Sequence, residues 1–283
     1  MGYLVSHPRL KLEIKLEEIE KLRLTENTIP RIVERLCGEI KRGICKNPVI
    51  VDKETHMVLD GMHRVAALKH LGYKLIPICL VNYSDPTITV ESWFRTIENG
   101  QRTDQNIRKD LEELGYNLQE TTDSELEEKM HDRKIMIGVI TSRKCYGISG
   151  NIESIKEIYE YLKQLERNLR SLGYKISYET ESDSLNKVKS GKALAAIVAP
   201  RITKTDVVTA ALSGEAFVHK STRHMIPARP LFVNVPIEWL NIDLKEANKL
   251  LLQHLSKKKI KRLPPGQTLD RRYEEELYVF SDT

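Results

Sequence analysis

Residues 60–64, Asp-Gly-Met-His-Arg, place a carboxylate, an imidazole and a guanidinium within five positions. The motif follows an apolar run and precedes an amphipathic segment that ends at Gly72, which predicts a strand, a tight turn and a helix. A helix start has N–H groups without acceptors and a partial positive charge, so it binds anions. The motif therefore predicts a phosphate site with a metal ligand or base. Taken alone, it also fits a capped helix with solvated polar residues in its first turn.

A second polar cluster is Lys-Ser-Thr-Arg-His at residues 220–224, between apolar flanks. Its two cations, two hydroxyls and imidazole could bind a carboxylate or a phosphate, or they could form a basic surface loop. Glu26 lies in a loop just before a helix that begins near Pro30, and by itself it reads as a surface glutamate. Trp93 could be a core residue or a pocket wall.

The composition limits the class of protein. The chain has 283 residues, 40% hydrophobic and 30% charged, which is typical of a globular protein with one large or two ordinary domains. Its net charge of +5 suits an anionic small molecule and does not require nucleic acid. The four cysteines form no C-x-x-C pair, so we expect reduced thiols and no zinc site. Residues 1–15 lack a signal-peptide core and no apolar run approaches a membrane span, so we expect a cytoplasmic protein without membrane contact.

Apolar patterning predicts a mixed α/β fold (α/β, or α+β). Residues 124–140 and 183–198 resemble each other, each reading as a short helix, a polar turn with lysine and an apolar strand. The basic run 256–262 reads as a solvated helix end. We expect domains at 1–102, 103–243 and 244–283, the last a helix and a charged tail that docks on the body or on a neighbouring subunit. Strands are predicted at 10–16, 48–52, 57–60, 75–81, 88–94, 174–178 and 230–236, and helices at 106–114, 152–172, 203–212 and 244–255.

The order of these features resembles the free L-serine kinases: a glutamate loop, a strand–Asp-Gly-x-His-Arg–helix unit, a tryptophan strand, and far downstream Lys-Ser-Thr-Arg-His-x-x-Pro. The resemblance runs from about residue 10 to about residue 243. It implies an N-terminal domain of the fold shared by ParB partition proteins and sulfiredoxin, and a C-terminal α/β domain with the active site in the cleft between them. It also implies an archaeal, thermophilic origin, with which the Lys, Arg and Glu content agrees.

The resemblance implies roles for the residues. The reaction would be Mg²⁺-dependent phosphoryl transfer from ATP or ADP to free L-serine, giving O-phospho-L-serine. Glu26 would be the general base, and Asp60 would hold the acceptor or the metal. The nucleotide phosphates would be bound by Gly61, Met62, His63, Arg64 and the helix start, with Arg223 supporting the phosphate or its loop. Serine would be bound by Trp93, Lys220, Ser221, Thr222 and His224. A monomer or small homo-oligomer is expected.

Two alternatives stay open at this stage. A ParB-like, nucleotide-switched DNA-binding protein is suggested by the basic run 257–262, although no helix-turn-helix pattern follows the first domain. A sulfiredoxin-like reductase would need a nucleophilic cysteine in the phosphate loop, where this chain has Met62.

Overall fold

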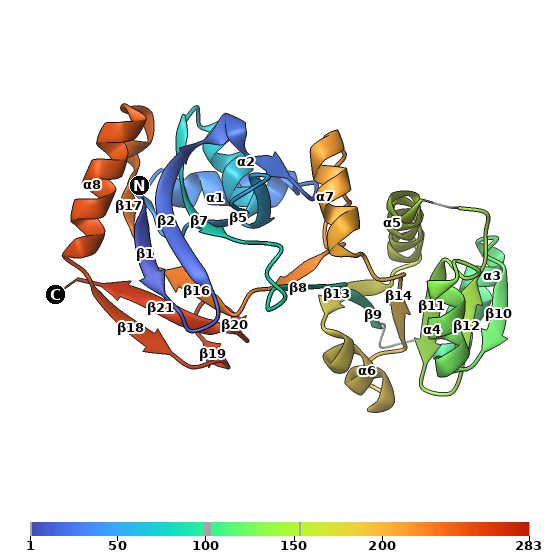
Figure 1. Cartoon of the computed structure of the whole chain (residues 1–283). Helices are drawn as coiled ribbons and strands as arrows, with labels where there is room; N and C mark the ends of the chain where they lie inside the picture. Colours follow the sequence, from blue (N-terminus) through green and yellow to red (C-terminus); the bar gives the residue numbers. More distant parts are fainter. Residues whose placement is uncertain (1, 99–102, 153, 283) are drawn as a thin grey trace. The chain divides into compact units, whose positions relative to one another are not determined.

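The computed structural model describes residues 2–98, 103–152 and 154–282. Within these ranges the chain divides into two units (Figure 1). Unit 1 comprises residues 1–90, 207–219 and 224–283, and unit 2 comprises residues 91–206 and 220–223. The mixed α/β class predicted from the sequence is confirmed.

Unit 1 contains a six-stranded sheet in the order β1-β2-β7-β5-β6-β3. Its central strands are the apolar runs of the sequence, and every residue of β5 and all but one of β7 are buried. In β2 the alternating Leu12, Ile14 and Leu16 are fully buried, as its period of two predicts. The strands are β1 (Tyr3–Ser6), β2 (Lys11–Glu18), β3 (Arg23–Leu24), β5 (Val49–Asp52), β6 (Met57–Asp60) and β7 (Leu75–Val81).

Helices cover this sheet, and two of them pack against each other. Helix α1 (Pro30–Ile40) contacts α2 (Met62–His70), and α8 (Leu244–Ser256) lies on β2. Asn248 of α8 both accepts from the N–H of Leu16 at 2.8 Å and donates to its carbonyl at 3.0 Å, which fixes the helix on the strand. The short elements here are η1 (Ile19–Lys21), β4 (Ile44–Cys45), β17 (Val235–Pro236), η2 (Ile237–Asn241), β19 (Gln267–Thr268) and β20 (Arg272–Tyr273).

The C-terminal segment is built into unit 1. Strand β21 (Glu276–Ser281) lies between β16 (Ala228–Leu231), to which it is parallel, and β18 (Lys259–Leu263), to which it is antiparallel (Figure 1). The prediction that the tail docks on the body is confirmed. The prediction of a helix end at 256–262 was wrong beyond Ser256, because Lys259–Leu263 finds a strand partner in the tail.

Unit 2 contains a second six-stranded sheet, in the order β10-β12-β11-β14-β9-β13. The internal repeat is confirmed: each copy gives a helix and then a strand, and the two strands, β11 and β14, pair antiparallel. The elements are β9 (Phe94–Glu98), α3 (Asp104–Glu113), β10 (Leu118–Thr121), α4 (Asp123–His131), β11 (Ile137–Thr141), β12 (Cys145–Ile148), α5 (Ile155–Ser171), β13 (Lys175–Glu179), α6 (Glu181–Lys189) and β14 (Ala195–Val198).

The division into units differs from the three consecutive domains expected from the sequence. Strand β9 pairs with β13 and β14, so the chain enters unit 2 at Glu91, before the predicted boundary. Residues 99–102, at which that boundary was placed, lie outside the described residues. The predicted strand 88–94 is interrupted at Ser92 and Trp93, which separate β8 (Thr89–Glu91) from β9. Helix α7 (Lys204–Ser213), β8 and β15 (Arg223–Met225) each contain a boundary between the units.

Candidate functional site

The loop that carries Glu26 is buried and bonded through its main chain. Glu26 is only 5% exposed. On one side of it, Thr25 accepts a hydrogen bond from the N–H of Phe217 at 2.9 Å, and on the other, Asn27 donates to the carbonyl of Phe217 at 2.8 Å. Because a carboxylate is costly to bury, this is not the surface glutamate that its sequence position alone would suggest.

Side-chain hydrogen bonds also tie this loop to the start of α2. The hydroxyl of Thr25 donates to the carbonyl of Val58 at 2.9 Å and contacts Sδ of Met62 at 3.4 Å. The N–H of Ile29 donates to Nε2 of His63 at 3.0 Å. The chain on both sides of Glu26 is therefore fixed to the end of β6 or to the first turn of α2.

The turn before α2 requires glycine. Gly61 has φ +102°, and a Cβ there would lie 2.6 Å from Cγ1 of Val49. Its carbonyl accepts from the N–H groups of Arg64 and Val65, at 2.8 and 3.1 Å, which begins the helix. The predicted strand–turn–helix is confirmed, and the first turn of α2 has the geometry of an anion site.

Asp60, the last residue of β6, forms an ion pair with Nη1 of Arg229 from β16. The Asp60 side chain is 46% exposed, whereas that of Arg229 is 9% exposed. Desolvation alone raises the pKa of Asp60, but the guanidinium groups of Arg229, Arg271 and Arg64 outweigh it and hold this pKa below its ordinary value. Arg229 was not among the residues predicted from the sequence; the available signal was a single cation in the apolar stretch before Pro230.

The two remaining polar residues of the motif, His63 and Arg64, form hydrogen bonds with main-chain groups of unit 1. The guanidinium of Arg64 donates through Nη1 to the carbonyl of Pro48 at 3.0 Å. His63 accepts at Nε2, so a neutral imidazole there carries its proton on Nδ1. The ring of His63 lies edge-on to that of His219, with centroids 5.2 Å apart.

In unit 2, the segment of residues 220–223 contacts the indole ring of Trp93. The Lys220 ammonium lies 4.0 Å from the centre of the Trp93 ring, and the Arg223 guanidinium lies 5.4 Å from it. The indole N–H donates to the carbonyl of Thr222 at 3.0 Å. Arg223 also pairs with Glu91 at 2.7 Å. Ser221 and Thr222 are buried. The roles of these residues in binding serine or phosphate stay predictions.

A buried ion pair fixes the main chain of Trp93. Arg95, 1% exposed, donates to Oε1 of Glu166 at 2.8 Å and to the carbonyl of Trp93 at 2.7 Å. Tyr178 donates to the other oxygen of Glu166 at 2.6 Å. Nη2 of Arg95 has no hydrogen-bond partner in the part of the chain that the structure describes. Arg95 was also not among the predicted residues, because Arg95 and Glu166 are 71 residues apart in the sequence.

His224 lies in unit 1, unlike the four residues before it. Its Nδ1 bonds the carbonyl of Leu59 at 3.0 Å, and its Nε2 bonds the hydroxyl of Tyr83 at 3.1 Å. Since a carbonyl only accepts, Nδ1 carries a proton, and in the neutral ring Nε2 then accepts from Tyr83. The structure thus places His224 beside the end of β6, and its role in binding serine stays a prediction.

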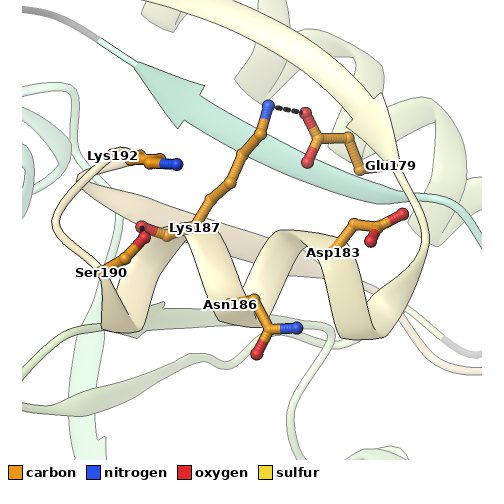
Figure 2. Close-up of a pocket in the computed structure, with 6 residues that line it drawn as sticks. All are labelled: Glu179, Asp183, Asn186, Lys187, Ser190 and Lys192. Carbon is orange, nitrogen blue, oxygen red and sulfur yellow. Dashed lines mark hydrogen bonds and ion pairs between the residues drawn. The ribbon is translucent and has the colours of Figure 1, made fainter.

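Two hollows lie away from these residues. One, of about 410 Å³, is lined by residues of β13 and α6 and the turn after it (Figure 2). There Lys187 pairs with Glu179 and, at 3.4 Å, with Glu98, so its charge is already balanced. The other, of about 520 Å³, is lined by Glu20, Lys21, Arg23, Glu54, Thr55, His56 and Leu212. Neither contains a predicted site residue.

The cysteines do not offer a reactive thiolate. Cys37, Cys45, Cys79 and Cys145 are all buried. Burial raises the pKa of Cys45 to about 11, and that of Cys79 and of Cys145 to about 12. A sulfiredoxin-like reaction needs an accessible thiolate, so the cysteines do not support this alternative.

The architecture of the chain has a counterpart among solved structures. A free serine kinase variant solved with AMP superposes with a TM-score of 0.67 at 22% identity, covering 83% of this chain and 97% of that one. At this identity the likeness establishes the shared architecture. No helix in the described ranges is long and apolar enough to cross a membrane.

Curated proteins are also similar to this chain in sequence. An ATP-dependent L-serine kinase of Staphylothermus marinus is 27% identical over 82% of this chain and 93% of its own length. An ADP-dependent L-serine kinase of Thermococcus kodakarensis is 24% identical over 82% of this chain and 95% of its length. A ParB-like protein of Sulfolobus acidocaldarius is 25% identical over 73% of this chain and 87% of its own length. No family model matches the chain. The resemblance to free L-serine kinases is confirmed.

Proposed function

We propose that this chain is a kinase that transfers a phosphoryl group from ATP or ADP to the hydroxyl of free L-serine, giving O-phospho-L-serine. The observation that carries the proposal is the buried Glu26 in a loop bonded to the first turn of α2. A phosphate-binding helix start and a carboxylate base are the two parts that phosphoryl transfer to an alcohol requires. The curated L-serine kinases, each matched over most of its length, support it.

The two carboxylates would have different roles. Asp60 is paired with Arg229, and its pKa lies below the ordinary value, so it is a weak base that stays ionised. It suits orienting the acceptor or holding a cation. Glu26 would orient the serine hydroxyl and accept its proton as the oxygen attacks the γ-phosphorus of ATP or the β-phosphorus of ADP.

The phosphates would be bound by the N–H groups at the start of α2, from Gly61 and Met62 onward, together with His63 and Arg64. In unit 2, Lys220 would pair with the serine carboxylate, and Trp93 would form the wall of the serine pocket. Thr222, Ser221 and His224 would complete or support this binding, and Arg223 would support a phosphate or its own loop.

Magnesium fits this arrangement as an ion that arrives with the nucleotide. No group of three or more metal-ligating side chains occurs among residues 2–98, 103–152 and 154–282. Mg²⁺ keeps several waters and commonly binds through phosphates and one or two carboxylates, so Asp60 suffices as its protein ligand. When bound, the ion would neutralise charge on the transferred phosphoryl group.

The direct test uses purified protein, MgCl₂ and free L-serine, with ATP and ADP in parallel. We expect O-phosphoserine, detected by ³¹P NMR and mass spectrometry, together with ADP or AMP as the second product. The reaction that proceeds identifies the donor. If serine is unchanged with both nucleotides, the proposal is wrong.

A ParB-like function is the second candidate, favoured by the Sulfolobus acidocaldarius relative. The basic run 257–262 would supply phosphate contacts, but Arg262 pairs with Glu276 at 2.6 Å and Lys258 with Asp282 at 2.7 Å. A gel shift with duplex DNA and nucleotide at low salt tests it, because phosphate binding of this kind weakens steeply with salt. Absence of a shift removes this candidate.

A further inference from the structure

The C-terminal strand β21 runs beside β16, the strand that carries Arg229. The two are parallel, and Arg229 stands opposite Leu277 in their register. Leu277 is fully buried, and Tyr273 packs with it and with Leu231 in one hydrophobic cluster. The chain from Tyr273 to Leu277 is therefore an integral part of unit 1. It places the carboxylate of Glu275 next to β16.

Arg229 lies between two carboxylates. Its Nη1 pairs with Asp60, and its Nε donates to Oε1 of Glu275 at 2.6 Å. The side chains of Arg229 and Glu275 are 9% and 12% exposed. Arg271 approaches the same oxygen of Glu275 at 3.5 Å, but its side chain is 52% exposed. Glu275 is therefore a well-shielded partner of Arg229 on the side away from Asp60.

The geometry of guanidinium makes this second contact matter. The group is planar, with its donors in a fixed arrangement, so a hydrogen bond at Nε determines the direction of the N–H groups at Nη1. A buried guanidinium that loses one of its partners turns or shifts to find another. The orientation that Arg229 presents to Asp60 thus depends on Glu275.

We propose that Glu275 and Arg229 are positioning residues of the kinase site, in which Glu275 orients Arg229 and Arg229 orients the Asp60 carboxylate. The inference rests on the proposed function, because it takes Asp60 as the carboxylate that holds the acceptor or the cation. It assigns a role to a segment that follows the last motif of the kinase resemblance. The chain just before β21 would then support the site through two consecutive ion pairs.

Glu275→Gln tests this, because it preserves the shape of the side chain and removes its charge. We expect kcat to fall about tenfold, the usual effect of losing a supporting partner, with the KM values for serine and nucleotide changed by less than about twofold. The matched control is Glu276→Gln. It changes the residue next to Glu275 and removes the ion pair between Glu276 and Arg262. Its kcat should stay within about twofold of wild type. Equal kcat values for the two variants would overturn the proposal.

A double-mutant cycle shows whether Glu275 acts through Asp60. In an Asp60→Asn background, Glu275→Gln should lower kcat no further, because the group that it positions is already altered. Losses that multiply would contradict the proposal. The same four proteins are also unfolded in urea, where we expect the midpoint shifts to be non-additive. This readout tests the inference even if the wild-type protein does not phosphorylate serine. Additive shifts of the urea midpoint would overturn the inference, whereas an inactive wild-type protein would count only against the proposed function.

Discussion

Glu26 of unit 1 and the two cations of unit 2 are held by different kinds of contact. In unit 1, Glu26 lies between two main-chain hydrogen bonds to Phe217, in a loop also bonded to Met62 and His63. In unit 2, Lys220 and Arg223 lie against the ring of Trp93, a contact between side chains. A buried main-chain bond fixes position, whereas a cation–π contact contributes about 0.5–2 kcal/mol and leaves a long side chain able to rearrange.

This difference matches the two tasks of the proposed reaction. Proton transfer needs a base held close to one geometry, which the buried loop of unit 1 provides. An amino acid that binds and leaves needs a cation that can exchange its partner, and Lys220 over Trp93 offers that. We therefore expect changes in unit 1 to act mainly on kcat and changes around Trp93 to act mainly on KM for serine.

The strongest test of the comparison is Glu26→Gln. The amide keeps the size of the side chain but cannot accept the serine proton, so we expect kcat to fall about 10³-fold, equivalent to about 4 kcal/mol. O-Phosphoserine formation measures the loss. Glu34→Gln, on the exposed face of α1, is the control and should retain wild-type kcat. A kcat within about tenfold of wild type for Glu26→Gln would remove Glu26 as the base.

Replacing Arg95 by methionine tests whether the buried ion pair with Glu166, which fixes the main chain of Trp93, stabilises unit 2. The change leaves Glu166 buried without its main partner, so we expect the free energy of unfolding to fall by about 3–4 kcal/mol. Arg170→Met is the matched control, because Arg170 contacts the same carboxylate at 3.7 Å but is 41% exposed. It should cost less than about 1 kcal/mol. Similar losses in urea unfolding for the two variants would refute this assignment.

Gly61→Ala tests how far unit 1 depends on its backbone. A methyl group there meets Val49 at 2.6 Å, in addition to the strain of φ +102°, so we expect a loss of about 3 kcal/mol. Gly43→Ala isolates the strain, because Gly43 has φ +105° and open space around its Cβ position. It should cost about 1 kcal/mol. Thermal and urea unfolding compare the two, and equal losses would show that the contact with Val49 is unimportant.

The smallest effect is expected at Trp93. Trp93→Leu removes the ring under Lys220 and Arg223, so KM for serine should rise about tenfold, equivalent to about 1.4 kcal/mol, with kcat nearly unchanged. Trp93→Phe keeps a ring but loses the hydrogen bond to Thr222, and it should lie between wild type and the leucine variant. A loss confined to kcat would reverse the proposed division of tasks.

Local patterns predicted much of this molecule. The Asp-Gly turn and α2 follow from a glycine that permits positive φ and from apolar residues at helical spacing, both of which act over a few residues. The two repeat copies were also recognisable, because each helix and strand is short and contiguous. Motifs and sequence position singled out the proposed residues, whereas their roles came from the resemblance and stay predictions.

Contacts between distant residues were not predictable from such patterns. Lys259–Leu263 became a strand because Glu276–Ser281 pairs with it, and no local signal announces that partner. Arg229 and Arg95 looked like ordinary cations in the sequence, and their burial depends on carboxylates far along the chain. The site therefore became visible in part from motifs, whereas the ion pairs that support it required the fold.

The route of the chain through unit 1 has a consequence for how the protein is made. The sheet that carries Asp60 uses strands from the first 81 residues. Strand β16, which carries Arg229, and its partner strand β21 both come after residue 227. Nearly all of unit 2 is a single stretch, residues 91–206. During synthesis this stretch can bury its core while unit 1 still lacks nearly half of its sequence. Completion of unit 1 then requires contacts as distant as that of Tyr278 with the carbonyl of Ser6, so we expect it to be the slower folding step.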